Sequence, residues 1–298
     1  MIGEVAALAT AVSWSFSYLF FTTAVRIIGS TTLNRLRLTI ALGFLVVSHL
    51  VVSGVPFPVH ATLGRWGWLS LSGIVGFAIA DTLLYQALYF LGAHRCSLVM
   101  ALVPVISALL AWGFFGEVLS PLQGIAILLV VGGIALVLWR RDDSNSTQQA
   151  SSRSYLLGIL CALGAACAQS LRYIFSKQGM IGGFPVLSTN VIQILAATVA
   201  AWGWALISKH DRPSFDGLRP RRARWTTVAG SFTGPFLGVT LSLVALQLSS
   251  VGIASTLMAL PPVFLLPLSY FVFKERIGLR AVAGTALAVA GVAVIFLL

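Results

Sequence analysis

The sequence predicts an all-α integral membrane protein with ten transmembrane helices. Of its 298 residues, 58% are apolar and only 9% are charged, whereas a soluble domain has roughly 45–50% apolar and about 25% charged residues. Mean hydropathy is +0.96, and the charged residues lie almost entirely between apolar runs. A chain of this composition cannot enclose its apolar residues in a water-soluble core. Soluble enzymes, secreted disulfide scaffolds and disordered chains are therefore excluded.

Ten apolar runs have the length of about 20 residues that a helix needs to cross the hydrocarbon of a bilayer. In chain order they cover residues 5–27, 32–53, 66–90, 95–115, 121–139, 155–178, 185–207, 225–247, 251–273 and 279–298. Most are joined by very short turns, so consecutive helices are expected to be antiparallel neighbours. The clearly polar connections are 54–65, 140–154 and 208–224.

The net charge of +11 would suggest a nucleic-acid partner in a soluble protein. Here the basic residues lie between apolar runs, which indicates membrane topology and contact with anionic headgroups instead. Cys96, Cys161 and Cys167 form no disulfide or metal pattern and are expected to be small core residues. The chain has no nucleotide-binding loop and no protease or hydrolase motif. We therefore predict no enzyme, no cofactor, no metal and no nucleic-acid partner.

The chain contains an internal repeat of a five-helix unit. Residues 97–138, shifted by 158, align without a gap on 255–296, so that Met100-Ala101-Leu102-x-Pro104 meets Met258-Ala259-Leu260-x-Pro262. The predicted units are 1–139 and 155–298, joined by a polar linker over 140–154. Because five crossings are an odd number, the second unit enters from the opposite face, and the two units are inverted repeats. Inverted repeats around a central cavity are typical of secondary transporters.

With these features the chain resembles the EamA-type ten-helix exporters of the drug/metabolite transporter superfamily. The resemblance covers essentially the whole chain. Its most specific parts are the five-plus-five helices, the prolines of the fourth and ninth helices, and the turns Phe115-Gly116-Glu117 and Phe273-Lys274-Glu275. It implies a multi-pass secondary transporter of the cell (inner) membrane that moves small metabolites, commonly amino acids, outward. The family is diverse, so the resemblance does not identify the cargo.

Two indications of membrane orientation disagree. The connections after odd-numbered helices carry fourteen basic residues, and the opposite connections carry two, Arg65 and Lys177. The positive-inside rule then makes the odd-numbered connections cytoplasmic and leaves both termini outside. The resemblance implies cytoplasmic termini instead, so the orientation stays open.

Ionisable residues inside membrane spans are costly and mark candidate sites. Asp81 lies in the third span with Tyr85 on the same helix face, and Arg172 lies in the sixth span with Gln169 and Tyr173 on its face. We predict that these residues bind the substrate. The alternative is structural: Asp81 and Arg172 form an ion pair that holds the helices together, or Arg172 reaches the membrane interface.

Other polar, aromatic and thioether side chains are expected at a similar depth. Substrate contacts are predicted for Trp14, Ser15, Tyr18, Met100, Asn190, Gln193 and Met258. The alternative for the aromatic residues is ordinary packing. The alternative for Asn190 and Gln193 is hydrogen bonding between helices, worth about 0.6 kcal/mol each. Arg35 and Arg37 open the second span and are expected to reach the lipid headgroups.

Prolines inside spans remove a backbone donor, and the carbonyl groups that they free must face protein or a wet cavity. We therefore predict bending points along the transport path, with hinge or gating roles, at Pro104, Pro235, Pro261 and Pro262.

The predicted function is export of small metabolites by alternating access, with amino acids that carry aromatic or apolar side chains as the favoured cargo. Arg172 would bind the carboxylate and Asp81 the ammonium group. Two alternatives stay open: a proton-coupled exporter of organic cations, in which Asp81 titrates, and a non-transporting structural or lipid-handling membrane protein. The expected partners are a small-molecule substrate and the lipid bilayer. The coupling ion and the choice between monomer and homodimer are open.

Overall fold

The computed structural model describes residues 2–115, 125, 128–133, 152–207, 218–248, 257–273 and 278–297. These residues form helices and turns, and no strand occurs among them. Six helices within the described ranges are long and apolar enough to cross a membrane: Ile2–Ile28, Ser30–Ser53, Leu63–Leu91, Arg153–Gly179, Val186–Ile207 and Arg221–Ala245. The chain is therefore an all-α, multi-pass membrane protein.

The first four predicted spans are all helical. Their elements are α1 (Ile2–Ile28), α2 (Ser30–Ser53), α3 (Leu63–Gly73), the π-helix η1 (Ile74–Ala80), α4 (Asp81–Leu91), α5 (Ala93–Met100) and α6 (Val103–Phe115). Elements α3, η1 and α4 form one continuous helix, which is the third span. The positive φ of Gly29 and Gly92, 78° at both, makes the tight turns after α1 and α4, because only glycine adopts this conformation without steric cost.

The helix of the sixth predicted span, 155–178, begins three residues earlier than predicted. Helix α8 (Ser152–Gly179) already includes the last three residues of the predicted linker 140–154. The elements that follow are α9 (Val186–Ile207), α10 (Arg221–Ser231), the π-helix η3 (Phe232–Gly238), α11 (Val239–Leu248), α13 (Pro261–Phe273) and α14 (Leu279–Leu297). The rest of the linker, most of the predicted fifth span and the turn residues Glu117 and Glu275 lie outside the described residues.

Helix irregularities recur at the sequence shift of 158 residues. The π-helices η1 and η3 begin at Ile74 and Phe232, and both are seven residues long. The helix of the fourth span is interrupted between Met100 and Val103, and the corresponding interruption in the ninth span follows Met258. π-Helices and discontinuous spans are frequent at functional sites. The second half therefore repeats the local distortions of the first.

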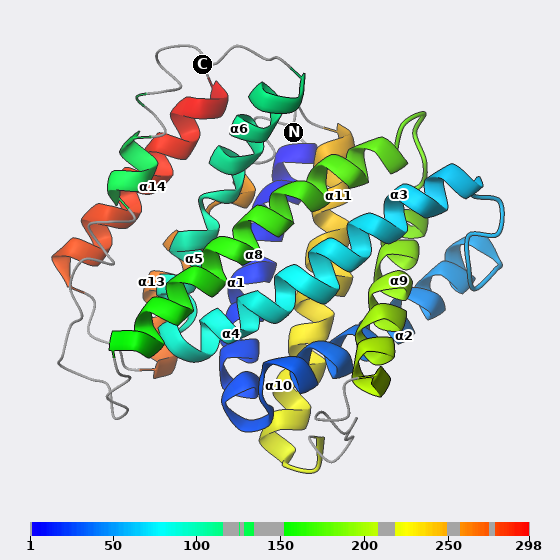
Figure 1. Ribbon diagram of the computed structural model, residues 1–298, viewed down its shortest axis with the longest axis horizontal. Helices are drawn as coiled ribbons and strands as arrows, with labels where there is room; N and C mark the ends of the chain where they lie inside the picture. The colour runs from blue at the N-terminus through cyan, green and yellow to red at the C-terminus, as the bar shows by residue number, and fades with distance from the viewer. Residues whose placement is uncertain are drawn as a thin grey trace.

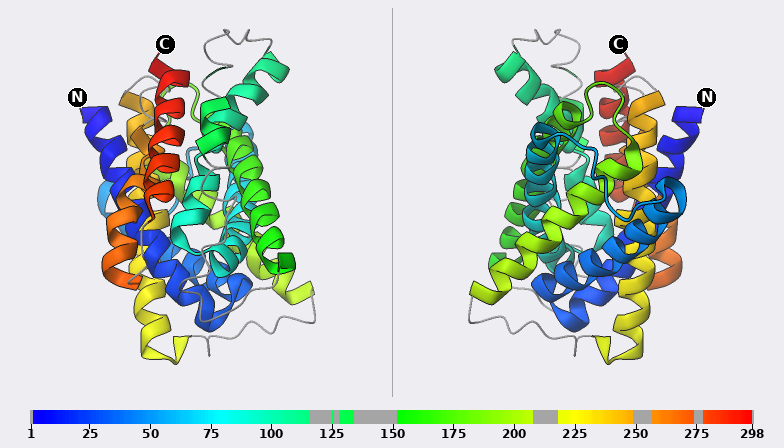
Figure 2. Two further views of the ribbon diagram at one scale, coloured as in Figure 1. Left: turned by 90° about the vertical axis from the view of Figure 1, so that its left-hand side faces the viewer. Right: turned by 90° about the vertical axis from the view of Figure 1, so that its right-hand side faces the viewer.

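Helices from the two halves pack against one another. Helix α8 lies along α3, η1 and α4 (Figure 1), α1 lies along α10, η3 and α11, and α2 packs against α9. The start of α1 and the end of α14 lie at the same end of the molecule (Figure 2). This placement is the one that an even number of membrane crossings produces.

The surface is apolar and the interior holds charged groups. Large apolar side chains stand well out of the bundle, among them Val51 and Phe271 at 80% and 77% exposure, whereas Arg37 and Arg172 are among the largest fully buried side chains. This distribution suits a protein surrounded by hydrocarbon, in which ionisable groups face the bundle interior.

Candidate functional site

A buried ion pair joins α2 to the start of α4. Arg37 of α2 is 2% exposed and binds the carboxylate Oδ2 of Asp81, whose side chain is 13% exposed. The Arg37 guanidinium also donates to Asn34 Oδ1 at 2.9 Å and to the Phe77 carbonyl oxygen at 3.2 Å. The carbonyl group lies in the middle of η1, and the carboxylate belongs to the first residue of α4. The π-helix therefore brings two acceptors to one guanidinium, which compensates the charge in the membrane interior.

The structure corrects one prediction from the sequence and one of its alternatives. Arg35 and Arg37 do not reach the headgroups, because both side chains are buried, at 4% and 2% exposure. The ion-pair partner of Asp81 is Arg37 and not Arg172. The geometry of α2 and η1 decides the partner, since these elements aim Arg37 directly at the carboxylate.

Arg172 of α8 is a second buried guanidinium, 1% exposed. Within the part of the chain that the structure describes, none of its Nε, Nη1 and Nη2 atoms has a hydrogen-bond partner. The guanidinium carbon lies 4.8 Å from the Phe77 ring centroid and 4.6 Å from that of Tyr173. A β-carbon at Gly76 would overlap the Arg172 side chain. The absence of a side chain at Gly76 therefore admits Arg172 between aromatic rings, where cation–π attraction acts on it.

Three predicted tyrosines gather around these charges. Tyr18 of α1 is within electrostatic range of Asp81, Tyr85 and Tyr173. The Tyr85 ring lies 5.1 Å from the Arg37 guanidinium carbon. Asp81 is in turn close enough to interact electrostatically with Arg172 as well as with Arg37. Five predicted site residues thus come together from α1, α4 and α8: Tyr18, Asp81, Tyr85, Arg172 and Tyr173.

The amides Asn190 and Gln193 lie on α9 and make hydrogen bonds between helices. Asn190 Nδ2 donates to the Pro235 carbonyl oxygen at 3.0 Å and to Thr240 Oγ1 at 3.1 Å. Gln193 Nε2 donates to Ser176 Oγ at 2.8 Å and to Ser72 Oγ at 3.2 Å. These contacts fit the structural alternative of the sequence analysis, because the amide nitrogens are already used to bind neighbouring helices.

The remaining predicted contacts are more dispersed. Ser15 donates to the Ala11 carbonyl oxygen of its own helix at 2.7 Å. Trp14 and Met258 pack in a small cluster of their own with α11, Met100 ends α5 at the helix interruption, and Gln169 Oε1 is buried without a hydrogen-bond partner among the described residues.

All four predicted hinge prolines lie at helix irregularities. Pro235 lies inside η3, Pro104 is in the first turn of α6, and Pro261 and Pro262 begin α13. Proline is tolerated in the first helical turn because those backbone nitrogens have no partner within the helix. Movement at these positions stays a prediction.

Sequence reasoning missed Asn34, which matches the predicted residue Asn190. Asn34 Nδ2 lies 2.9 Å from the Phe77 carbonyl oxygen and 2.8 Å from Thr82 Oγ1. Asn190 bonds Pro235 and Thr240 in the same way, and these acceptors follow Phe77 and Thr82 by 158 residues. Each asparagine therefore holds the π-helix of the next span. The signal was present in the sequence as Asn34-x-x-Arg37 and Asn190-x-x-Gln193 in the second and seventh spans.

A family model for the EamA-like transporter family matches residues 1–139 and 156–297. The chain belongs to the EamA-like transporter family. This assignment confirms the resemblance to the drug/metabolite transporter superfamily. The matching family model is described as one of transporters.

Two further comparisons found a curated relative and a solved structure that are similar to this chain. The chain is 27% identical over 163 residues to the uncharacterized transporter sll0355 of Synechocystis sp. (strain ATCC 27184 / PCC 6803 / Kazusa), and the match covers 47% of this chain and 49% of that relative. It thus spans about half of the relative's length. A solved crystal structure superposes with a TM-score of 0.61 at 20% identity, over 97% of this chain and 96% of that one. That likeness concerns the fold.

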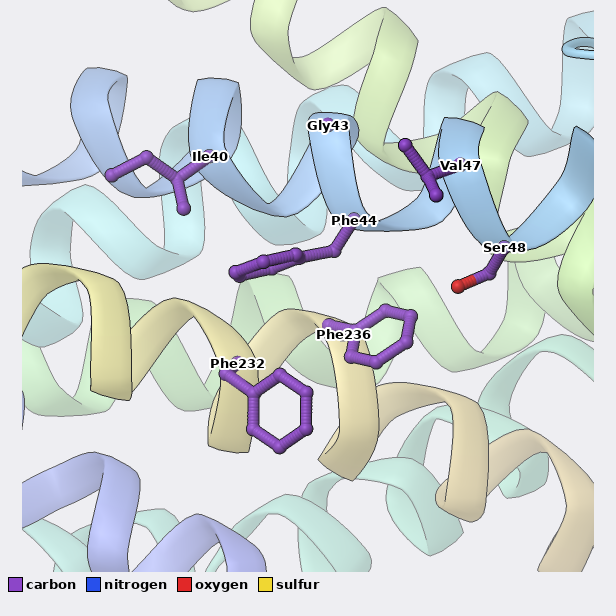
Figure 3. Close-up of a pocket in the computed structure, with 7 residues that line it drawn as sticks. All are labelled: Ile40, Gly43, Phe44, Val47, Ser48, Phe232 and Phe236. Carbon is purple, nitrogen blue, oxygen red and sulfur yellow. The ribbon is translucent and has the colours of Figure 1, made fainter.

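The EamA chain also has an apolar groove that is separate from the buried charges. It lies between α2 and η3, has a volume of about 440 Å³, and is lined by Ile40, Gly43, Phe44, Val47, Ser48, Phe232 and Phe236 (Figure 3). None of the predicted site residues lines it.

Proposed function

We propose that this EamA protein is a secondary active transporter that exports amino acids with aromatic or apolar side chains by alternating access. The observation that carries the proposal is the buried guanidinium of Arg172, which has no hydrogen-bond acceptor among the described residues. A buried unpaired charge is destabilising and is retained where an anionic group of a ligand completes its bonding. A carboxylate is the anion that suits the planar guanidinium, because it accepts two parallel hydrogen bonds.

Asp81 and the tyrosines supply the rest of an amino-acid site. Of the two carboxylate oxygens of Asp81, Arg37 binds Oδ2. The partly exposed carboxylate can therefore also accept a hydrogen bond from an α-ammonium group. Tyr18 and Tyr173 lie within electrostatic range of each other and offer aromatic surface for the side chain of the cargo. The proposed roles are thus carboxylate binding by Arg172, ammonium binding by Asp81 and side-chain contact by the two tyrosines.

The matched irregularities support the ten-span arrangement of two inverted repeats. The π-helices, the helix interruptions and the acceptors bonded by Asn34 and Asn190 all recur at a shift of 158 residues. An even number of spans also agrees with chain ends at one end of the molecule (Figure 2). In such transporters one repeat rocks against the other around a fixed central site.

Charge favours a zwitterion over an organic cation. Among the described residues, the charged side chains that meet in this region are Arg37, Asp81 and Arg172, and the one carboxylate of these three is already bound by an arginine. A monovalent cation would therefore meet net positive charge, whereas the carboxylate of an amino acid would meet the unpaired guanidinium.

Counterflow in proteoliposomes tests the proposal. Vesicles loaded with unlabelled amino acids are expected to accumulate labelled aromatic and aliphatic amino acids saturably, and a pH gradient reveals whether protons are coupled. Arg172→Gln should raise KM by about 10- to 100-fold, because charge-assisted hydrogen bonds are worth about 1.5–3 kcal/mol. Gly76→Ala should impair transport in the same direction, since its β-carbon displaces Arg172.

The matched control is Arg153→Gln, which removes an exposed arginine near the start of the same helix. It should leave KM unchanged. Saturable amino-acid exchange with an unchanged KM in Arg172→Gln would refute the role of Arg172. The absence of exchange for every amino acid would refute the cargo.

A further inference from the structure

The groove between α2 and η3 opens on the outer surface of the bundle. Val47 on its rim is 62% exposed and Phe232 is 44% exposed. Phe44 projects into the space between the two helices (Figure 3), and its ring centroid lies 5.7 Å from those of Phe232 and Phe236. A β-carbon at Gly43 would meet nothing within 4 Å. The groove is thus open and lined by aromatic side chains, and it lies on the lipid-facing surface.

A stripe on α10 connects this groove to the basic end of the helix. Arg221, Trp225 and Phe232 are spaced by four and seven residues, which places them on one helix face. Trp225 is 63% exposed, and Arg221 and Arg224 are exposed beside it. The rise of 1.5 Å per residue separates Arg221 from Phe232 by about 16 Å. This span suits one lipid molecule, with a charged headgroup, an interfacial tryptophan and an acyl chain in sequence.

We propose that the groove and this stripe form a binding site for one anionic phospholipid. An acyl chain occupies the groove against Phe44, Phe232 and Phe236, and the headgroup phosphate binds Arg221 and Arg224. The two adjacent arginines favour an anionic over a zwitterionic headgroup, because each basic residue near the membrane surface adds about 1 kcal/mol of attraction.

The corresponding surface of the first half lacks both parts of the site. At a shift of 158 residues, Ile74 and Ala78 take the places of Phe232 and Phe236, and Leu63 and Trp66 take those of Arg221 and Arg224. The repeated fold therefore forms without the phenylalanines and arginines. Their joint presence in one half fits a ligand that binds there, independently of the transported cargo.

Native mass spectrometry of the purified full chain tests this site. Phosphatidylglycerol and phosphatidylcholine with identical acyl chains are added at equal concentrations. The wild-type protein should retain one molecule of phosphatidylglycerol in preference to phosphatidylcholine. The double variant Arg221→Gln, Arg224→Gln should weaken that binding about 25-fold, the loss of two headgroup interactions. Gly43→Leu fills the groove and should weaken binding of both lipids about tenfold or more, because the new side chain excludes about two methylene groups of the acyl chain from the groove.

Two variants control for nonspecific effects. Gly203→Leu adds the same side chain at another helical glycine with open space around it, and Arg153→Gln removes an arginine from α8, which begins at the same end of the molecule as α10 (Figure 1). Both should bind like the wild type. Equal retention of the two lipids, or full retention by Gly43→Leu, would overturn the proposal. So would a lipid-free dimer that Gly43→Leu dissociates, because a second copy of the chain would then occupy the groove.

Discussion

Two buried arginines should respond to the same substitution in opposite directions. Arg37 and Arg172 are 2% and 1% exposed, and both contact aromatic rings. They differ in bonding: Arg37 binds Asn34, Phe77 and Asp81, whereas the Arg172 guanidinium has no hydrogen-bond acceptor among the described residues. Methionine is similar in length and apolar, so Arg→Met at each position removes the charge without leaving a large cavity.

The magnitudes follow from these contacts. Arg37→Met leaves the Asp81 carboxylate buried without its ion-pair partner, and breaking a buried pair in this way costs about 3–5 kcal/mol. Arg172→Met removes an unpaired buried charge. It gives up cation–π attraction of about 2 kcal/mol, but it also removes a desolvation cost of several kcal/mol. We therefore expect a net gain of about 1–3 kcal/mol in the free energy of unfolding, together with loss of transport.

Titration with sodium dodecyl sulfate in mixed micelles, followed by circular dichroism, gives the free energy of unfolding of each variant. Arg153→Met is the matched control. It removes an exposed arginine and should change stability by less than about 0.5 kcal/mol. A large destabilisation by Arg172→Met, comparable to that of Arg37→Met, would refute the reasoning, because it would mean that Arg172 has a structural partner.

Two further predictions concern close contacts between helices and are measured by the same titration. Gly73→Ala should destabilise the protein by about 1–3 kcal/mol, because its β-carbon would overlap the backbone of Gln193 on α9. Gly67→Ala in the same helix meets open space and should stabilise by about 0.5–1 kcal/mol; equal effects would contradict the packing of α3 on α9. Asn34→Leu should cost about 3 kcal/mol, because it removes the hydrogen bond to the buried Phe77 carbonyl oxygen of η1 and leaves the charged Arg37 Nε without its acceptor. A change below 1 kcal/mol would show that Asn34 does not hold the π-helix.

Much of the fold could be predicted because membrane insertion depends on local composition. The first span, predicted over 5–27, is α1 (Ile2–Ile28), and the seventh, predicted over 185–207, is α9 (Val186–Ile207). Apolar runs of sufficient length must become helices in hydrocarbon, since no other structure satisfies the backbone within a single segment. The prolines predicted the helix interruptions for an equally local reason, the missing backbone donor.

These local sequence patterns did not predict the π-helices. Gly73, Gly76 and Asp81 flank or occupy a stretch whose hydropathy is that of an ordinary span. The extra residue in each turn of η1 is held by Asn34, which is more than forty residues away in sequence. A local pattern contains no information about such a contact.

The sequence by itself determined the membrane class, most of the span boundaries, the repeat and the transporter family. It also indicated Asp81 and Arg172 as ionisable residues inside membrane spans. Only the tertiary structure decided that Arg37 binds Asp81 and that Arg172 has no hydrogen-bond acceptor among the described residues. The physical reason is that hydropathy acts on each segment separately, whereas the pairing of charges depends on which helices cross. In this protein that crossing is set by glycines, by the asparagines and by the π-helices that they hold.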